Sequence, residues 1–227
     1  MSNYFYHKLL RKYVIVIGSL FDGIQIENSN GTFVVPINYI DKDKLIQMYL
    51  RREKSYKGFS ITMPRISYTL GDMYYQPQKK LNRIHKYVDS TGLSSLYTPV
   101  PYDISVEMNV IANRTRDITQ IVEQILPLFT PDIKITANLI PDLDISLDLS
   151  LGLNNVWVKD NYEGNLTDKR FIVYTFDFKL SAYFFNRIIE ESEDKIIHTA
   201  TANLYELGAS TKDTTINAYA NNEITYE

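Results

Sequence analysis

The chain has 227 residues, a hydrophobic content of 44% and a formal net charge of −3, which is enough apolar material for one large domain with a sizeable core. It contains no cysteine, and this excludes disulfides, thiolate metal sites and cysteine nucleophiles. Its longest apolar run, residues 13–17, is far too short to span a membrane, and no signal-peptide pattern opens the chain. We therefore expect a protein that folds in the cytosol.

The charge is unevenly distributed along the chain. Residues 1–100 carry a net charge of +7 and residues 101–227 a net charge of −10. A basic half and an acidic half can pair head to tail between copies or dock onto charged partners. The alternative is that both sets of charges are simply solvated surface.

Apolar spacing in the first 40 residues predicts a helix and then a hairpin. Residues 4–17 have apolar side chains at helical intervals, and Gly18 is a plausible helix end. Residues 24–39 follow as two apolar strands separated by Asn30-Gly31, a pair that supplies the positive φ of a tight turn.

The next segments predict a helix, a strand and a loop. Asp41 can cap a helix over residues 41–53, and residues 61–75 form a strand interrupted at Pro64. Residues 76–96 are basic and poorly patterned, so we expect a long loop there that is either functional or mobile.

The clearest strand and helix come next. From residue 102 to residue 110 the even positions are apolar and the odd positions polar, which predicts a strand with one buried and one wet face. Apolar residues then recur at helical spacing from Ile118 to Phe129, with Pro127 and Pro131 stopping the run.

The second half of the chain adds strands and a polar end. Residues 143–151 and 170–184 alternate as strands, the latter as the longest strand, while residues 154–165 form a polar excursion containing Trp157. The fold class expected is α+β, a mostly antiparallel or mixed twisted sheet packed against two or three amphipathic helices, with extended loops or arms. We expect a single domain over residues 1–186, and a C-terminal extension over residues 187–227 that orders on partners.

The sequence contains no convincing metal-binding or catalytic site. Asp144, Ser146 and Asp148 imitate the start of a calcium loop, but Leu149 stands where glycine is required, and a wet strand face explains them. His7, His85 and His198 have no metal-ligand spacing. The sequence predicts no catalytic, cofactor-binding or metal-binding residues, no cofactor, and a protein that is not an enzyme.

Several short motifs occur in a fixed order over about 130 residues. They are Tyr4-Phe5-Tyr6 with Arg11 and Tyr13; Gly18, Leu20, Phe21 and Ile24-Gln25-Ile26; Val35-Pro36-Ile37 with Tyr39; Pro64-Arg65-Ile66; Pro99 with Pro101-Tyr102; Asp117, Gln120 to Pro127, Phe129 and Pro131; and, more weakly, residues 172–178. Together these motifs resemble one known family, the tail sheath stabiliser and completion proteins of contractile-tailed bacteriophages. The family has no catalytic residues to carry over.

The resemblance implies a structural virion protein of the tail and neck, assembled in the host cytoplasm. It implies a homo-oligomer, a hexameric ring that caps the head-proximal end of the contractile tail, stabilises the last sheath layer and joins tail to neck. The implied partners are the tail sheath protein, the tail tube terminator and neck or head-completion proteins, with DNA passing through the ring without specific binding and no membrane contact. Two alternatives stay open: another neck or baseplate adaptor, and a nucleic-acid-binding module using the basic loop 79–86.

Overall fold

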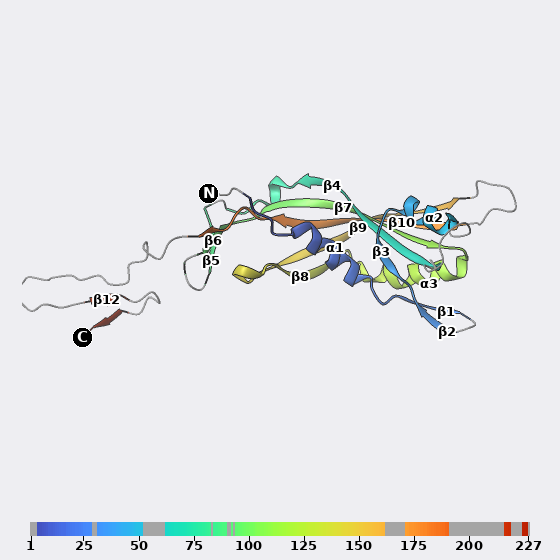
Figure 1. Cartoon of the computed structure of the whole chain (residues 1–227), viewed down its shortest axis with the longest axis horizontal. Helices are drawn as coiled ribbons and strands as arrows, with labels where there is room; N and C mark the ends of the chain where they lie inside the picture. The colour runs from blue at the N-terminus through green and yellow to red at the C-terminus, as the bar shows by residue number, and fades with distance from the viewer. Residues whose placement is uncertain are drawn as a thin grey trace, which may run out of the picture.

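The body of the protein is an elongated α+β structure built on one long sheet (Figure 1). The computed structural model describes residues 4–28, 31–51, 62–82, 84–89, 92, 94–161, 171–190, 216–218 and 224–226. The sheet has six strands in the order β3-β4-β7-β10-β9-β8. Only β3 and β4 run parallel, and the other neighbours are antiparallel. The bounds are β3 (Ile37–Tyr39), β4 (Arg65–Tyr75), β7 (Val100–Ala112), β8 (Asp132–Ile140), β9 (Ile145–Asn161) and β10 (Phe171–Phe184).

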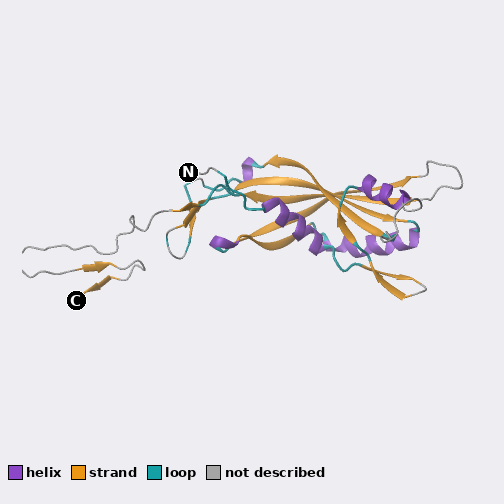
Figure 2. Cartoon of the chain, viewed as in Figure 1, coloured by secondary structure: helices purple, strands orange, loops and turns teal. Residues whose placement is uncertain are grey.

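One face of this sheet carries the main core. The even-numbered residues of β7 pair with the even-numbered residues of β10, as in Met108 opposite Phe176 and Val106 opposite Phe178. These side chains pack with the buried residues of α1 (Leu9–Leu20) and α3 (Thr115–Ile125). The helical periodicity predicted for α3 is confirmed, because Ile118, Ile121, Val122 and Ile125 are all buried. Figure 2 shows the helices against the long strands.

The opposite face is only partly wet, which corrects the expectation from alternation alone. Asp103 and Asn109, at odd positions of β7, are buried. Helix α2 (Lys42–Arg51) covers one end of this face, where Leu45 packs with Ile111 and Val173. The predicted cap of α2 is confirmed, since Asp41 Oδ1 accepts the N–H of Asp43 at 2.9 Å and of Lys44 at 3.4 Å.

Helix α1 differs from its predicted bounds at both ends. It begins at Leu9, not at residue 4, and it continues through Gly18 to Leu20. A Cβ atom at position 18 would lie 2.7 Å from the hydroxyl of Tyr68, which donates to the carbonyl of Val14 at 2.8 Å. Gly18 is therefore required for close approach of a strand residue to the helix, and it does not end the helix.

Three segments were misassigned from sequence. The expected loop 76–96 contains the helical turn η1 (Pro77–Lys79) and strands β5 (Lys86–Val88) and β6 (Ser94–Tyr97), which join β11 (Ile189–Glu190) in a three-stranded sheet. The alternation of Ile133, Ile135 and Leu139 in β8 was missed. The polar excursion around Trp157 belongs to β9, whose 17 residues make it longer than the 14 of β10.

The remaining described elements are short. The turns η2 (Leu126–Leu128) and η3 (Pro141–Leu143) follow α3 and β8, and strands β12 (Ile216–Ala218) and β13 (Ile224–Tyr226) pair with each other near the C-terminus. In the described part of the chain, no helix is long and apolar enough to cross a membrane. The predicted fold class, α+β with a mostly antiparallel or mixed sheet packed against two or three helices, is confirmed, and the described residues contain three α-helices.

The buried side chain of Tyr13 connects α1 with the C-terminal end of β10, and its ionisation makes the free energy of unfolding fall at alkaline pH. The hydroxyl of Tyr13 donates to the carbonyl of Tyr183 at 2.5 Å and accepts the Tyr183 N–H at 3.1 Å. Burial raises the pKa of Tyr13 from 10.0 to about 12. The folded chain therefore keeps this proton over a pH range in which the unfolded chain loses it.

We predict that this group lowers the free energy of unfolding by about 2 to 3 kcal/mol as the pH rises from about 10 to about 12. Below pH 10 the contribution is complete, because both states are protonated. The Tyr13→Phe variant should lose this part of the pH dependence, whereas Tyr6→Phe, at an exposed position, should keep it. Denaturant unfolding at a series of alkaline pH values measures the difference, and parallel curves for the wild type and Tyr13→Phe would contradict the assignment.

Candidate interaction surfaces

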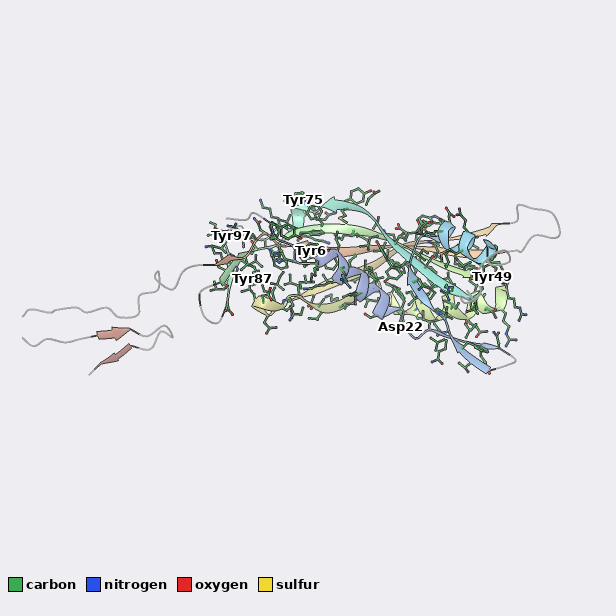
Figure 3. The ribbon with its side chains drawn as sticks, viewed as in Figure 1. Tyr6, Asp22, Tyr49, Tyr75, Tyr87 and Tyr97 are labelled. Atoms are coloured by element: carbon green, nitrogen blue, oxygen red, sulfur yellow. The ribbon has the colours of Figure 1, made fainter. Side chains whose placement is uncertain are left out.

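The N-terminal end of the body gathers exposed aromatic and apolar side chains, and we call this surface the aromatic end. Figure 3 shows Tyr6, Tyr75, Tyr87 and Tyr97 at this end, near β5 and β6. Exposed apolar side chains clustered together are typical of protein interaction sites, where tyrosine offers apolar area with a polar tip. The exposed members are Tyr4, Phe5, Tyr6, Tyr74, Tyr75, Leu81, Tyr97 and Val100.

Two hollows open on the aromatic end. One, of about 330 Å³, lies between Phe5 and Tyr97 on one side and residues 186, 187 and 189 on the other. The second, of about 350 Å³, is lined by Tyr75, Leu81 and residues 98–102. Both have mixed polar and apolar walls, which suits a protein partner with protruding side chains.

A buried carboxylate fixes the segment that carries part of this surface. Asp103 Oδ1 accepts from Lys79 Nζ at 3.1 Å, and Lys179 Nζ lies 3.7 Å from Asp103 Oδ2. Lys79 also donates to Ser181 Oγ at 2.7 Å. Because Asp103 is buried and both lysines are partly exposed, this cluster holds η1 on the sheet and positions Tyr75 and Leu81 on either side of it.

The basic loop 79–86 is less available than its sequence indicates. Lys79 is engaged by Asp103, and Lys86 Nζ lies 5.0 Å from the centre of the Tyr97 ring. Both lysines thus interact with other residues of the same chain, and this argues against the alternative that the loop binds nucleic acid.

The second candidate surface is the hairpin of β1 (Gln25–Asn28) and β2 (Gly31–Val34), which projects from the opposite end of the body (Figure 1). The predicted hairpin is confirmed, and Gly31 has the positive φ, +120°, expected after the turn. The continuous strand expected to residue 39 instead breaks at Pro36, and β3 joins the main sheet.

Two glutamines of α3 cover the outer edge of β1 as a strand would. Gln120 Oε1 accepts the N–H of Glu27 at 2.8 Å, and its Nε2 donates to the Glu27 carbonyl at 3.2 Å. Gln124 makes the equivalent pair with Gln25, at 3.4 Å and 2.6 Å. Side-chain amides thus satisfy the backbone groups that an edge strand leaves open.

The outer edge of β2 has no such cover among the described residues, where only β1 pairs with this strand. The backbone N–H and C=O groups of Gln25 and Glu27 point toward α3 and not toward β2. Val34 and Thr32 lie opposite these two residues, so their own N–H and C=O groups point away from β1. Phe33 is 47% exposed and Val34 57% exposed. Beside them lies a hollow of about 270 Å³ whose walls include Ile26, Val35 and residues 62–64.

Ser146 and Asp148, which imitate calcium-loop positions, lie on β9, whereas Asp144 lies in the turn just before that strand. Thr136 donates to Asp148 Oδ1 at 2.6 Å, and Asn138 donates to Asp144 Oδ1 at 3.2 Å. In the described residues, no group of three His, Asp or Glu side chains could hold a metal ion.

The two histidines that the structure describes make separate contacts. His7 Nε2 lies 2.7 Å from the carbonyl of Asn186, and His85 packs edge-on against Tyr87. His198 lies outside the described residues.

Sequence reasoning missed both surfaces described above. The adjacent aromatics at residues 4–6 and 74–75 were a usable signal for the aromatic end, because a core position rarely needs neighbouring tyrosines that point to opposite faces. The capped edge of β1 had no local signal, since the glutamines lie about 95 residues away in sequence.

Comparison with known proteins settles the family. The family model described as T4-like virus Myoviridae tail sheath stabiliser matches residues 4–226. The chain belongs to this family. A curated relative, "Tail completion protein gp15" of Enterobacteria phage T4, is 26% identical over an alignment 227 positions long that covers 94% of this chain and 82% of the relative.

Family membership confirms the resemblance found from motifs and makes the chain a structural component of a phage tail, part of the virion. The match also extends beyond those motifs. It includes residues 76–96 and the segment after Asn186, for which the sequence motifs offered no counterpart.

We predict that Gln120→Ala raises hydrogen exchange at the Glu27 amide by about 5-fold, because the loss of one neutral hydrogen bond costs about 1 kcal/mol. Gln124→Ala should act more weakly on the Gln25 amide, whose bond is longer. Glu123→Ala on the exposed side of the same helix is the control. Amide exchange measured by NMR checks the effect, and unchanged protection at Glu27 would show that the glutamines do not hold this edge.

Proposed function

We propose that six copies of this chain form a ring at the head-proximal end of the contractile tail. The ring caps the last sheath layer and the tube terminator, and it joins the finished tail to the neck. It acts by binding alone, with no catalysis. The observation that carries the proposal is the family match over residues 4–226.

The shape of the body supports a ring. A closed head-to-tail ring needs two different surfaces on each subunit that fit each other. The aromatic end and the β1–β2 hairpin lie at opposite ends of the body (Figure 1), so one subunit can offer different surfaces to different neighbours. The body is also longer than a sphere of its mass, because the 17 residues of β9 alone extend over about 55 Å. Six such bodies leave room for a DNA duplex to pass without specific contacts.

The basic and acidic halves of the sequence do not form separate faces. Strand β4, from the basic half, lies directly beside β7, from the acidic half. Ring closure by opposed charged halves therefore has little support from the fold. We propose instead that apolar surface and paired strands provide most of the contact between subunits.

The aromatic end is the surface we assign to another tail component. Tyrosine and other aromatics are enriched at protein interfaces, and the two hollows there give a partner places to insert side chains.

We further propose that residues 1–186 act as one structural unit and that residues 187–227 serve as an extension used in assembly.

Our first expectation is that the purified full-length chain forms hexamers with six-fold rings. Native mass spectrometry gives the number of subunits, and negative-stain images give the symmetry. Adding these rings to sheathed tails that lack the protein should slow loss of sheath. A monomer at micromolar concentration, or rings that leave the sheath unprotected, would contradict the proposed function.

A second expectation is that Leu81→Asp leaves rings intact but weakens their binding to sheathed tails by about 10-fold, the effect of losing a central apolar contact. Leu81 is 45% exposed, so a charge there should not unfold the chain. Leu128→Asp is the matched control, because Leu128 is 46% exposed but lies on η2 after α3. Co-sedimentation with tails measures binding, and equal binding by the two variants would show that the aromatic end is not the docking surface.

A further inference from the structure

Among the residues that the structure describes, no strand pairs with the outer edge of β2, so this edge can accept one more strand. Thr32 and Val34 point their N–H and C=O groups outward, and the other edge of the same hairpin is already closed by Gln120 and Gln124. An added strand would hydrogen-bond to these groups and place alternate side chains beside Phe33 and the adjoining apolar hollow. The hairpin therefore has one open direction for growth.

The same chain contains strands that match this acceptor. β12 and β13 have three residues each, comparable to the four of β2, and among the described strands each pairs only with the other. Their sequences, Ile-Asn-Ala and Ile-Thr-Tyr, read apolar-polar-apolar, the pattern of a strand with one buried face. The family match runs to residue 226, so these strands belong to the family's common sequence.

The charges of the two segments and the length of the chain between Glu190 and Ile216 are compatible with pairing of β12–β13 with β2 of another copy. Residues 191–227 carry seven acidic and two basic side chains, a net −5. Residues 51–61, which lead directly into the hollow-lining residue Thr62, carry four basic side chains and one acidic. The 25 residues between Glu190 and Ile216 can span at most about 80 to 90 Å, which exceeds the spacing of about 40 Å expected between neighbouring subunits of this mass.

We propose that the β12–β13 strands of one copy add to the outer edge of β2 of a second copy, an inference that rests on the proposed ring. Strand and acceptor are different surfaces of one chain, so the contact is heterologous and can repeat around a closed ring. Pairing of β2 with β2 would instead be two-fold and would stop at a dimer.

The test uses the full-length chain and a photoreactive benzoylphenylalanine in place of Phe33. ¹⁴N chains carrying the probe are mixed with ¹⁵N chains without it, and cross-linked peptides are identified by mass. We expect the probe to label residues 216–226 of the ¹⁵N copy. A probe at Trp157, which is 46% exposed, is the control and should not label them.

A backbone variant isolates the strand edge. Val34→Pro removes one outward N–H while sparing the pairing of β2 with β1, so it should reduce cross-links between copies by about 5-fold or more. Val34→Thr keeps the N–H and should leave them unchanged. Cross-links only within one chain, or no labelling of residues 216–226, would overturn the inference.

Native mass spectrometry of the same mixture separates the two proposals. Hexamers without these cross-links would reject the strand pairing and leave the ring. Cross-links between copies without hexamers would support the pairing and reject the ring.

Discussion

The antiparallel pairing of β7 with β10 is the constraint on which the rest of the structure depends. The pairing runs without a bulge from Ile172 opposite Ala112 to Phe184 opposite Val100. Because strand alternation has a period of two, this fixed register assigns every side chain of both strands to one face or the other. On the core face, the ring of Phe178 lies 5.5 Å from that of Phe21 and 4.9 Å from that of Phe129. One residue of β10 thus connects the end of α1 with the end of α3.

The opposite face specifies the register by polar contacts. Thr175 donates to Asn109 at 2.7 Å in a buried pair, and Glu107 accepts from Asn109 and from Lys42 of α2, each at 3.0 Å. Burial alone would raise the pKa of Glu107, but the two hydrogen bonds and the charge of Lys42 together outweigh it and lower that pKa. Of these contacts, only the bond between Thr175 and Asn109 joins β10 to β7. A shift of one residue between the two strands would leave this buried pair without its hydrogen bond, which is costly. The polar face therefore favours one arrangement of the sheet.

The long sheet also explains where interaction surfaces occur. Helices α1 and α3 cover one face and α2 covers one end of the other, and the two candidate surfaces described above lie at opposite ends of the body (Figure 1). The cluster around Asp103 holds the aromatic end in place, and Gln120 and Gln124 hold the hairpin at the other end. The body therefore presents a different candidate surface at each end. Both candidate surfaces depend on contacts between distant parts of the chain.

Sequence alone determined the elements whose pattern is local. The period of two in β7 and β10 and the helical period of α3 follow from which residues must avoid water, so these elements and the fold class could be predicted. Only the tertiary structure determined the conformation or burial of residues whose environment differs from what the local sequence pattern predicts. Gly18 stays inside a helix because Tyr68 approaches it, Asp103 is buried because Lys79 reaches it from a separate segment, and β1 is closed by glutamines of α3. Each of these contacts joins residues far apart in sequence, and no local pattern encodes such proximity.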